Sequence, residues 1–572
     1  MNNQLQQQIR KRVRLLSIVV LAVSLLLFTK LYMVQIVNYD EFSERADRQY
    51  QKPADAFNRG TIYFSDRTGN LISAATLKTG FLIAINPKIL QKNNSVESAY
   101  QKISAIIPLD EAVFLSQANK ANDTYEEVKK RASEDEGKAI AALKIPGVSV
   151  FKDKWRYYPG GTLAAHVLGF MGYKGDEISG RYGLERQYND TLSRESDAVY
   201  VNFFAEMFSN LKKTVGDRDF EGDIVTTIEP RTQAYVENML KGIQSQYSAE
   251  RTGAIIMNPS TGEIHAMAIN PTFDPNNFKE EKNVGVFKND LVESVYEMGS
   301  IIKPLTMAVG VDQGKVHATS TYNDTGSISS DGRTIWNFDK KGRGVITLQY
   351  ALSKSLNTGF AYIVQRVGNK TFAEYVHKFG LGERTGIDLP NESKGLLDNL
   401  KSPRNIEYIT ASFGQGIAVS PIEVTRAFAS VVNGGKLVQP RVVKKIQYKV
   451  GFTKEVNQSE PLRVISESTA EEIRNMMVYN VDNSLLDGKA KNPRYAIGAK
   501  TGTAQIAERG SYSEDRFLHS FVGFLPEGDP QFVVFMYIVN PRGVNFASET
   551  LAKPFIELTK FLINYYQIPP DR

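Results

Sequence analysis

The sequence predicts an α+β protein of at least two domains, in which strands from both ends of the second domain form a sheet around a mostly helical insertion. A chain of 572 residues is too long for one ordinary hydrophobic core. Two apolar strands, 252–258 and 263–269, are joined by the tight turn Pro259-Ser260-Thr261-Gly262. Two more apolar strands, 520–525 and 532–539, come near the end. Helical patterns fill the sequence between the two pairs, which is typical of the α+β class.

The composition is that of an ordinary globular protein and excludes several kinds of site. Charged residues make up 23% of the chain, and the formal net charge of +6 includes no dense basic block, so nucleic-acid binding has little support. The absence of cysteine excludes disulfides and cysteine–zinc sites, and the five histidines are scattered without a metal-binding spacing. We expect neither a metal nor another cofactor.

The N-terminus predicts a membrane anchor. Four cations within 10–14 precede an apolar run from 15 to 28, which Lys30 interrupts and which continues to 37. Read as one segment, 15–37 has 23 residues, enough to cross a bilayer if Lys30 extends toward the interface. No small-residue cleavage site follows. We expect an uncleaved single-pass anchor in the cell (inner) membrane, with 1–14 cytoplasmic and the rest of the chain extracytoplasmic.

The texture of the sequence changes near 235–250, where we place the domain boundary. The first domain, 38–240, has the pattern of mixed short strands and helices, and its charge-rich stretch 118–138 predicts an exposed helix. Near the boundary, a strand at 222–228 leads to a helix that starts near Pro230. The second domain is expected to span 250–567 and to end with a helix at 549–566.

A serine and a lysine three residues apart open a helical pattern at 300–312. On a helix this spacing places Ser300 and Lys303 on one face. A serine hydroxyl becomes a good nucleophile when a base takes its proton, and lysine is such a base when burial or a nearby cation keeps it neutral. Gly299 and Pro304 place Ser300 at the helix start, where free backbone N–H groups favour negative charge. Alone, this spacing more often marks a solvated helix face.

Two further short motifs follow. Ser355-Leu356-Asn357 offers a hydroxyl for proton relay and an amide that can hold a substrate amide group. Lys500-Thr501-Gly502-Thr503 offers a cation and hydroxyls for a substrate carboxylate, and Gly502 would let the substrate backbone approach closely. Each motif is weak alone, since Ser209-Asn210-Leu211-Lys212 repeats the first spacing and Lys78-Thr79-Gly80 repeats the last.

The three motifs taken together and in order are specific, although each motif alone is not. SxxK, SxN and KTG follow in that order, as in serine β-lactamases and penicillin-binding proteins. YEMGSIIKPLT (296–306), SKSLNTGF (353–360) and AKTGTAQ (499–505) resemble the three motifs of class B penicillin-binding proteins. SFGQGIAVSPIEV (412–424) is especially similar to the FtsI-type division enzymes of that family.

The first domain carries the resemblance further. RGTIYFSDRTG (59–69), RYYPGGTLAAHVLGF (156–170) and GRYGLERQYND (180–190) resemble the non-catalytic, dimerisation-type pedestal of the same family. The resemblance implies an elongated mixed α/β pedestal and a penicillin-binding/serine β-lactamase-like transpeptidase domain, with an antiparallel sheet and a helical subdomain. It also implies that Arg59 and His166 are structural. One departure, the glutamate of TTIEP where aspartate is more usual, is expected to lie on the solvent side.

The same resemblance implies the chemistry of a peptidoglycan D,D-transpeptidase. Ser300 would attack the D-Ala–D-Ala carbonyl of a stem peptide, with Lys303 as the base. Backbone N–H groups of Ser300 and Thr503 would form the oxyanion hole. Ser355 and Lys500 would pass the proton to the leaving D-alanine. β-Lactams would acylate Ser300 covalently.

Substrate binding and partners are implied in the same way. Thr501 and Thr503 would hold the terminal carboxylate, and Asn357 the stem amide. A neighbouring stem of the lipid-linked precursor polymer would supply the acceptor amine. Implied protein partners are an FtsW/RodA-type glycosyltransferase and divisome proteins at the membrane. The SFGQG segment favours a septal role in cell division over an elongation-type role in cell shape. A D,D-carboxypeptidase, a β-lactamase or penicillin sensor, and a non-catalytic division scaffold stay open.

Overall fold

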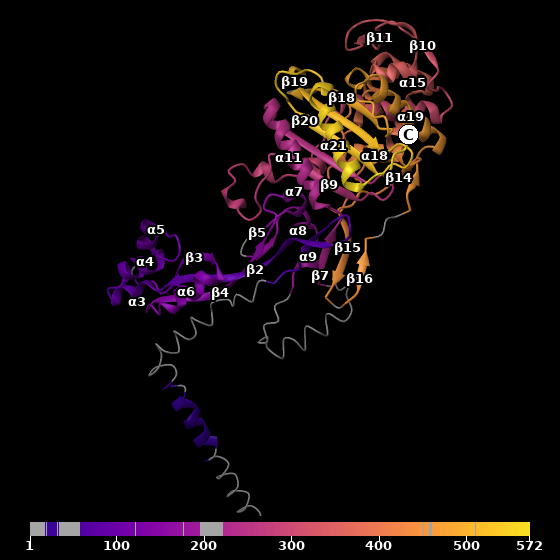
Figure 1. The fold of residues 1–572 in the computed structure, drawn as a ribbon. Helices are drawn as coiled ribbons and strands as arrows, with labels where there is room; N and C mark the ends of the chain where they lie inside the picture. Colours follow the sequence, from indigo (N-terminus) through magenta and orange to yellow (C-terminus); the bar gives the residue numbers. More distant parts are fainter. Residues whose placement is uncertain are drawn as a thin grey trace, which may run out of the picture. The chain divides into compact units, whose positions relative to one another are not determined.

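The computed structural model describes residues 18, 20–30, 32–33, 58–120, 122–174, 177–194, 221–449, 451–456, 460–508 and 511–572. The predicted cytoplasmic tail, part of the predicted anchor and the Ser209–Lys212 repeat lie outside these residues. No helix in the described ranges has the length and apolar character needed to cross a membrane. The chain forms two compact units, one built on 78–155 and the other on 59–77, 156–194 and 221–572 (Figure 1).

The first unit is a small α/β body with its own core. Its strands are the later part of β2 (Leu71–Ile85), β3 (Glu126–Ala132) and most of β4 (Val148–Tyr157). Its helices are α3 (Pro87–Lys92), α4 (Val96–Ser104), α5 (Glu111–Ala118) and α6 (Glu134–Ala142). Buried side chains from the four helices, β2 and β3 make up this core.

The prediction of an exposed helix over 118–138 is wrong for 119–120 and 122–133, most of its length. Residues 126–132 form strand β3, because Val128 and Ala132 belong to the core of this unit and β2 supplies an antiparallel partner. Tertiary pairing thus overrides the charge-rich composition. Helix α6 begins only at Glu134, after a capping box formed by Ser133 and Glu136.

The second unit contains a sheet in which distant parts of the sequence pair. Strand β1 (Ile62–Ser65) runs parallel to β7 (Gly222–Thr226), and β7 runs antiparallel to β15 (Val443–Tyr448), which continues to β16 (Thr453–Glu455). A hairpin from the second half of the chain therefore completes a sheet that begins near residue 62. Short elements flank it: α7 (Ala165–Leu168), β5 (Met171–Lys174), β6 (Glu177–Gly180), α8 (Gly183–Gln187) and α9 (Asn189–Leu192).

A buried ion cluster stabilises this part of the second unit. The Glu185 carboxylate accepts hydrogen bonds from Arg156 Nε at 2.5 Å and Arg59 Nε at 2.6 Å, and from the Tyr158 hydroxyl at 3.2 Å. Burial alone would raise the pKa of Glu185, but the charges and hydrogen bonds of the two arginines outweigh burial and lower it. His166 is likewise buried and bonds the Val286 carbonyl. Arg59 and His166 are thus buried structural residues.

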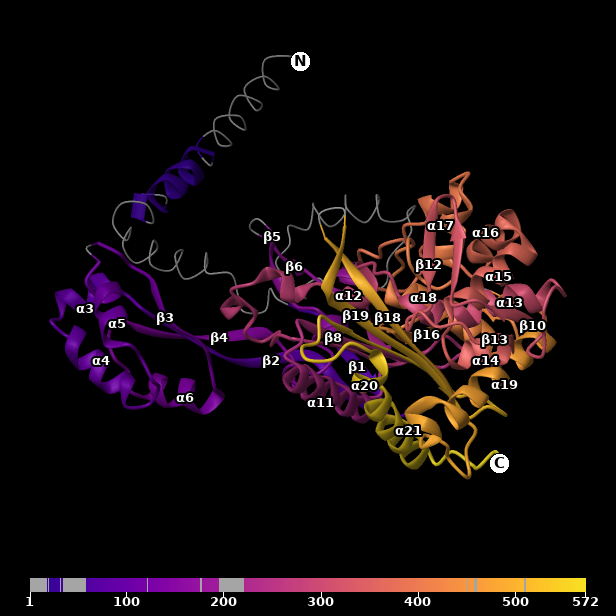
Figure 2. The same cartoon turned by 90° about the horizontal axis from the view of Figure 1, so that it is seen from above.

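The predicted sheet of the second domain is confirmed. Its strand order is β18 (Gly498–Glu508), β19 (Ser511–Leu525), β20 (Phe532–Val539), β8 (Arg251–Met257) and β9 (Ile264–Asn270), all antiparallel. Alternate residues face opposite cores: Val534 and Met536 pack with helices α11 (Pro230–Tyr247) and α21 (Ala552–Tyr566), whereas Val533 and Phe535 belong to the core on the other face. Figure 2 shows α11 and α21 together on one side of the sheet.

The helical insertion lies between β9 and β18. It comprises α12 (Asp290–Glu293), a 3₁₀ turn η5 (Gly299–Ile302), α13 (Lys303–Asp312), α14 (Leu348–Ser353), α15 (Asn357–Val367), α16 (Asn369–Lys378), α17 (Asn405–Ala411), α18 (Pro421–Val432) and α19 (Glu467–Asn483). Helices α13 and α18 contribute to the core on the inner face of the sheet. The predicted helix 300–312 is present, with its first turn tightened to 3₁₀.

The expectation that Glu229 faces solvent is wrong. Its residue exposure is only 2%, and its carboxylate accepts hydrogen bonds from Thr232 N at 2.7 Å and from the Tyr565 hydroxyl at 2.9 Å. Glu229 therefore caps the N-terminus of α11 and ties it to α21.

Three glycines bring separate backbones into contact around η5. Gly299 has φ +63°, and a Cβ there would lie 2.7 Å from the Thr503 carbonyl oxygen. On the other side its N–H donates to the Gly414 carbonyl at 2.9 Å, and a Cβ on Gly414 would overlap the Gly299 carbonyl. A Cβ on Gly502 would lie 2.5 Å from the Met298 carbonyl oxygen. These contacts fix η5 between strand β18 and the loop before α18.

Glu185→Gln should destabilise the fold by about 3–5 kcal/mol at neutral pH, because two buried guanidinium groups lose their counter-charge. A carboxylate with a lowered folded-state pKa stabilises the protein above the unfolded pKa, near 4.5, and that stabilisation disappears as pH falls through the folded value. Denaturant unfolding at several pH values should therefore show the gap between wild type and variant closing in acid. Glu134→Gln, which breaks an exposed pair with Lys138, is the control. A pH-independent gap would contradict the assignment.

Gly299→Ala should cost much more stability than Gly314→Ala. Both glycines have φ near +60°, so both substitutions carry the left-handed penalty of about 1–2 kcal/mol. Only the Cβ at 299 meets backbone, whereas the space around Gly314 is open. The comparison of thermal unfolding midpoints isolates the packing contribution, and equal midpoints would mean that the backbones can move apart freely.

Candidate functional site

Ser300 lies in η5 and Lys303 begins α13, so the predicted pair does share the start of one helix. Ser300 is partly exposed, whereas Lys303 is completely buried. The rings of Phe360 and Phe413 lie 5.4 and 5.9 Å from the Lys303 amine. The nucleophile candidate therefore reaches solvent while the base candidate is enclosed.

The Lys303 amine is held by the second motif. Its Nζ donates to the Ser355 carbonyl at 2.7 Å, to Ser355 Oγ at 3.2 Å and to Asn357 Oδ1 at 2.9 Å. Burial, and after it the positive charge of Lys500, hold the pKa of Lys303 well below its usual value. Both effects favour the neutral amine, the form that can accept a proton.

Ser355 is the centre of the constellation. It follows α14 in a left-handed conformation, φ +56°, which is unusual for a residue with a side chain. Its hydroxyl oxygen lies 3.2 Å from the Lys303 amine and 3.0 Å from the Lys500 amine. Ser355 Oγ is thus the single atom that bridges the two lysines, in a position suited to proton relay.

Asn357 is occupied at both ends of its amide. Oδ1 accepts from Lys303, and Nδ2 donates to the Trp336 carbonyl at 2.9 Å. In this structure Asn357 positions the lysine, and its contact with a substrate amide stays a prediction.

The third motif lies on β18, as its extended pattern indicates. Lys500 is 2% exposed and donates to Ser355 Oγ and to the Thr501 carbonyl at 2.9 Å, and burial lowers its pKa to about 7. Thr501 and Thr503 alternate with Lys500 and Gly502 along the strand and are partly exposed. Thr503 Oγ1 also accepts from Ala547 N at 3.1 Å.

The structure explains why residue 502 must be a glycine, which the sequence alone did not reveal. Its missing side chain makes room for the backbone just before Ser300, and its contact with substrate stays a prediction. The repeat Lys78-Thr79-Gly80 lies within β2, far along the chain from the other motifs. No pattern in the sequence indicated that Glu297, which is bonded by Tyr512 and Gly416, belongs to the surroundings of Ser300.

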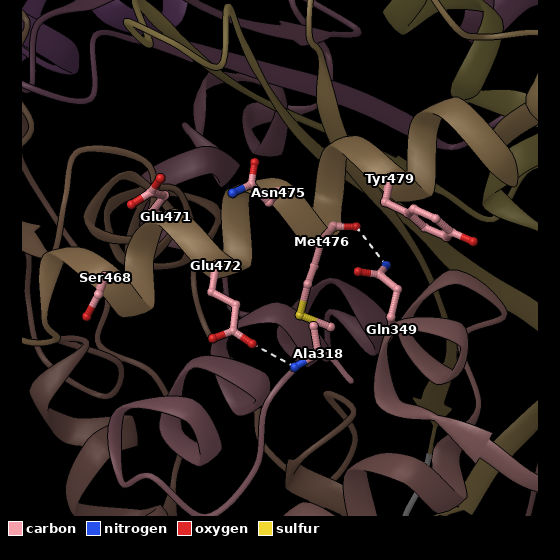
Figure 3. Close-up of a pocket in the computed structure, with 8 residues that line it drawn as sticks. All are labelled: Ala318, Gln349, Ser468, Glu471, Glu472, Asn475, Met476 and Tyr479. Atoms are coloured by element: carbon pink, nitrogen blue, oxygen red, sulfur yellow. Dashed lines mark hydrogen bonds between the residues drawn. The ribbon is translucent and has the colours of Figure 1, made fainter. Parts of the chain in front are cut away.

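A separate cavity of about 460 Å³ lies against α19 (Figure 3). Glu472 there accepts from Ala318 N at 2.6 Å, and Gln349 Nε2 donates to the Met476 carbonyl at 3.2 Å. None of the predicted site residues lines this cavity. Across the described ranges, no cluster of three or more metal-ligating side chains occurs.

Comparison with known proteins identifies the families of both parts of the chain. Residues 252–558 match the penicillin-binding protein transpeptidase domain, and residues 55–215 match the penicillin-binding protein dimerisation domain. Stage V sporulation protein D of Bacillus subtilis is 31% identical over 564 residues, covering 96% of this chain and 84% of that protein. Peptidoglycan D,D-transpeptidase FtsI of Buchnera aphidicola is 24% identical, with coverage of 98% and 95%.

Solved structures share the fold. Penicillin-binding protein 2X of Streptococcus thermophilus superimposes with a TM-score of 0.72 at 21% identity, covering 89% of this chain and 79% of that one. Penicillin-binding protein 3 of Mycobacterium tuberculosis, complexed with ampicillin, gives a TM-score of 0.68 at 23% identity, covering 90% and 96%. With a dimerisation domain ahead of a transpeptidase domain and relatives along its whole length, this chain belongs to the class B penicillin-binding proteins.

Proposed function

We propose that this protein is a serine D,D-transpeptidase that cross-links peptidoglycan stem peptides through an acyl-enzyme on Ser300. The observation that carries the proposal is the placement of Ser355 Oγ between two buried lysines of lowered pKa, beside the turn that presents Ser300. A relative that aligns with 98% of this chain is named a peptidoglycan D,D-transpeptidase.

In the acylation step, the Ser300 oxygen attacks the carbonyl of the penultimate D-alanine, and the neutral Lys303 amine takes the hydroxyl proton. In the structure Lys303 Nζ faces three acceptors, one more than the two N–H bonds of a neutral amine can serve, so one of these contacts must be given up when the lone pair accepts the Ser300 proton. The oxyanion is stabilised by the N–H groups of Ser300 and Thr503, about 3–4 kcal/mol per donor in comparable sites. The tetrahedral intermediate then collapses: its C–N bond breaks, the carbonyl re-forms, and the acyl group remains on Ser300 as an ester.

The leaving D-alanine needs a proton on its amine. The path Lys303–Ser355–Lys500 supplies it, because Ser355 Oγ is within hydrogen-bond reach of both lysine amines. Thr501 and Thr503 line the exposed side of β18, where their hydroxyls would hold the terminal carboxylate. The amine of a second stem peptide then attacks the carbonyl of the acyl-enzyme. The proton path runs in the opposite direction, the new amide bond forms and Ser300 is released.

The cellular role we propose is septal wall synthesis at the membrane. Its support is the 412–424 segment and the FtsI relative, with the basic N-terminus and apolar run 15–37 as a single-pass anchor. An FtsW/RodA-type glycosyltransferase and divisome proteins would be its partners. Depletion should give filaments; rounded cells would instead indicate a role in elongation.

Intact mass after incubation with benzylpenicillin tests the nucleophile. Wild type should gain one covalently bound penicillin, and Ser300→Ala should gain none while keeping its unfolding midpoint. Ser209→Ala, which alters the repeat of the same spacing, is the matched control and should react like wild type. An adduct on Ser300→Ala would refute the assignment, and hydrolysed drug without adduct would indicate a β-lactamase.

The pH dependence of penicillin acylation tests the base. A lysine of lowered pKa predicts a rate that rises with pH and levels off well below pH 10.5, the ordinary value for lysine. Because Lys303 and Lys500 meet at one hydroxyl, the midpoint belongs to the pair. Stopped-flow acylation between pH 6 and 11 measures it, and a rate still rising near pH 10.5 would exclude Lys303 as the base.

A further inference from the structure

Glu297 lies three residues before Ser300, and its carboxylate is held by several hydrogen bonds. Both of its carboxylate oxygens lie 3.0 Å from the Tyr512 hydroxyl, and Oε1 accepts from Gly416 N at 3.1 Å. Burial raises the pKa of Glu297, and the tyrosine and Gly416 bonds oppose that shift. The acylation step proposed above assigns Glu297 no role.

The backbone that carries Glu297 is fixed on both sides. Tyr296 exchanges two backbone hydrogen bonds with Val419, at 3.0 and 2.9 Å, and the Met298 carbonyl accepts from Ser520 Oγ at 2.7 Å. The carboxylate is therefore presented from a segment whose backbone is bonded on both sides.

Tyr512 lies on the part of β19 that extends beyond the sheet. Strand β20 pairs with β19 over 518–525, and before that stretch β19 pairs with β18 at Ser511, Tyr512 and Phe517. Figure 2 shows the β18–β19 hairpin extending past the rest of the sheet. A two-stranded hairpin has little stability by itself. Arg516 bonds Glu250 near the base of this hairpin, and Tyr512 bonds Glu297 near its end. The Tyr512–Glu297 bond therefore holds the outer hairpin against the segment that carries Ser300.

The outer hairpin lengthens an exposed edge of the sheet at which a peptide could bind. Strand β18 is the edge strand of its sheet, so its free backbone groups can pair with an extended peptide. Beyond Thr503 the strand continues to Ala507, which pairs with Tyr512, so a peptide that extends along β18 past Thr503 would meet the part of the strand that the Tyr512–Glu297 bond holds.

We propose that Glu297 and Tyr512 are positioning residues that hold the outer edge of β18 ready for long stem peptides. They thereby set a preference for long over short acyl donors. The proposal rests on acylation of Ser300, the proposed function.

The test compares two thioesters with the same reactive D-alanyl end, one short and one carrying a full stem peptide. In Tyr512→Phe the half-saturating concentration of the long donor should rise about tenfold, because a hydrogen bond to a charged group is lost. The maximal acylation rate should stay unchanged. Short-donor kinetics should change less than about threefold. Glu297→Gln, which keeps one acceptor oxygen, should lose less length preference than Glu297→Ala.

Controls separate this role from a general structural one. Tyr479→Phe removes a hydroxyl from a side chain of similar exposure, 46% against 45%, and should leave the length preference intact. Effects of Tyr512→Phe and Glu297→Ala should not add in the double variant. Equal losses for both donors, or an unchanged preference, would overturn the proposal. Failure of wild type to react with either donor or with benzylpenicillin would instead refute the proposed function.

Discussion

The site depends on one packing constraint, the contact of three backbones at Gly299. With no side chain between them, the Gly414 loop, the η5 turn and strand β18 approach to hydrogen-bonding and van der Waals distance. This contact sets how far Ser300 stands from Thr503 and hence whether their N–H groups can serve one oxyanion. A side chain at 299 would separate the sheet from the helical insertion just where the reaction needs both.

The same closeness explains the electrostatics. Lys303 from the insertion and Lys500 from the sheet are both buried, so each loses hydration and favours its neutral form. One hydroxyl, Ser355 Oγ, contacts both amines, and its residue has a left-handed backbone conformation between helices α14 and α15. This conformation accompanies the placement of a proton carrier between two buried amines.

The sequence predicted what depends on short-range pattern. The strands at 252–258 and 532–539 and the helix after Pro230 follow from patterns of a few residues, and the three motifs are identified by their order along the chain. The sequence-based predictions failed where a residue distant in the sequence determines the local structure. Strand β3 forms because β2 pairs with it, and Glu229 is buried because Tyr565 and α11 contact it. Gly502 is needed because the Met298 carbonyl lies against it. The Glu297–Tyr512 bond joins residues more than two hundred positions apart, so no local signal could have revealed it.

The fold also explains why residues of the first domain matter to a site in the second. Strand β15 pairs with β7, and Asp388, whose pKa burial raises to about 6, accepts from the Val442 and Val443 N–H groups at 2.7 Å just as β15 begins. Residues 59–77 and 156–194 therefore belong to the same compact unit as Ser300. Because the Arg59–Glu185 cluster is in that unit, a change there acts on a body continuous with the catalytic sheet. Residues that the sequence assigns to different domains are therefore held together here by paired strands as well as by the covalent chain.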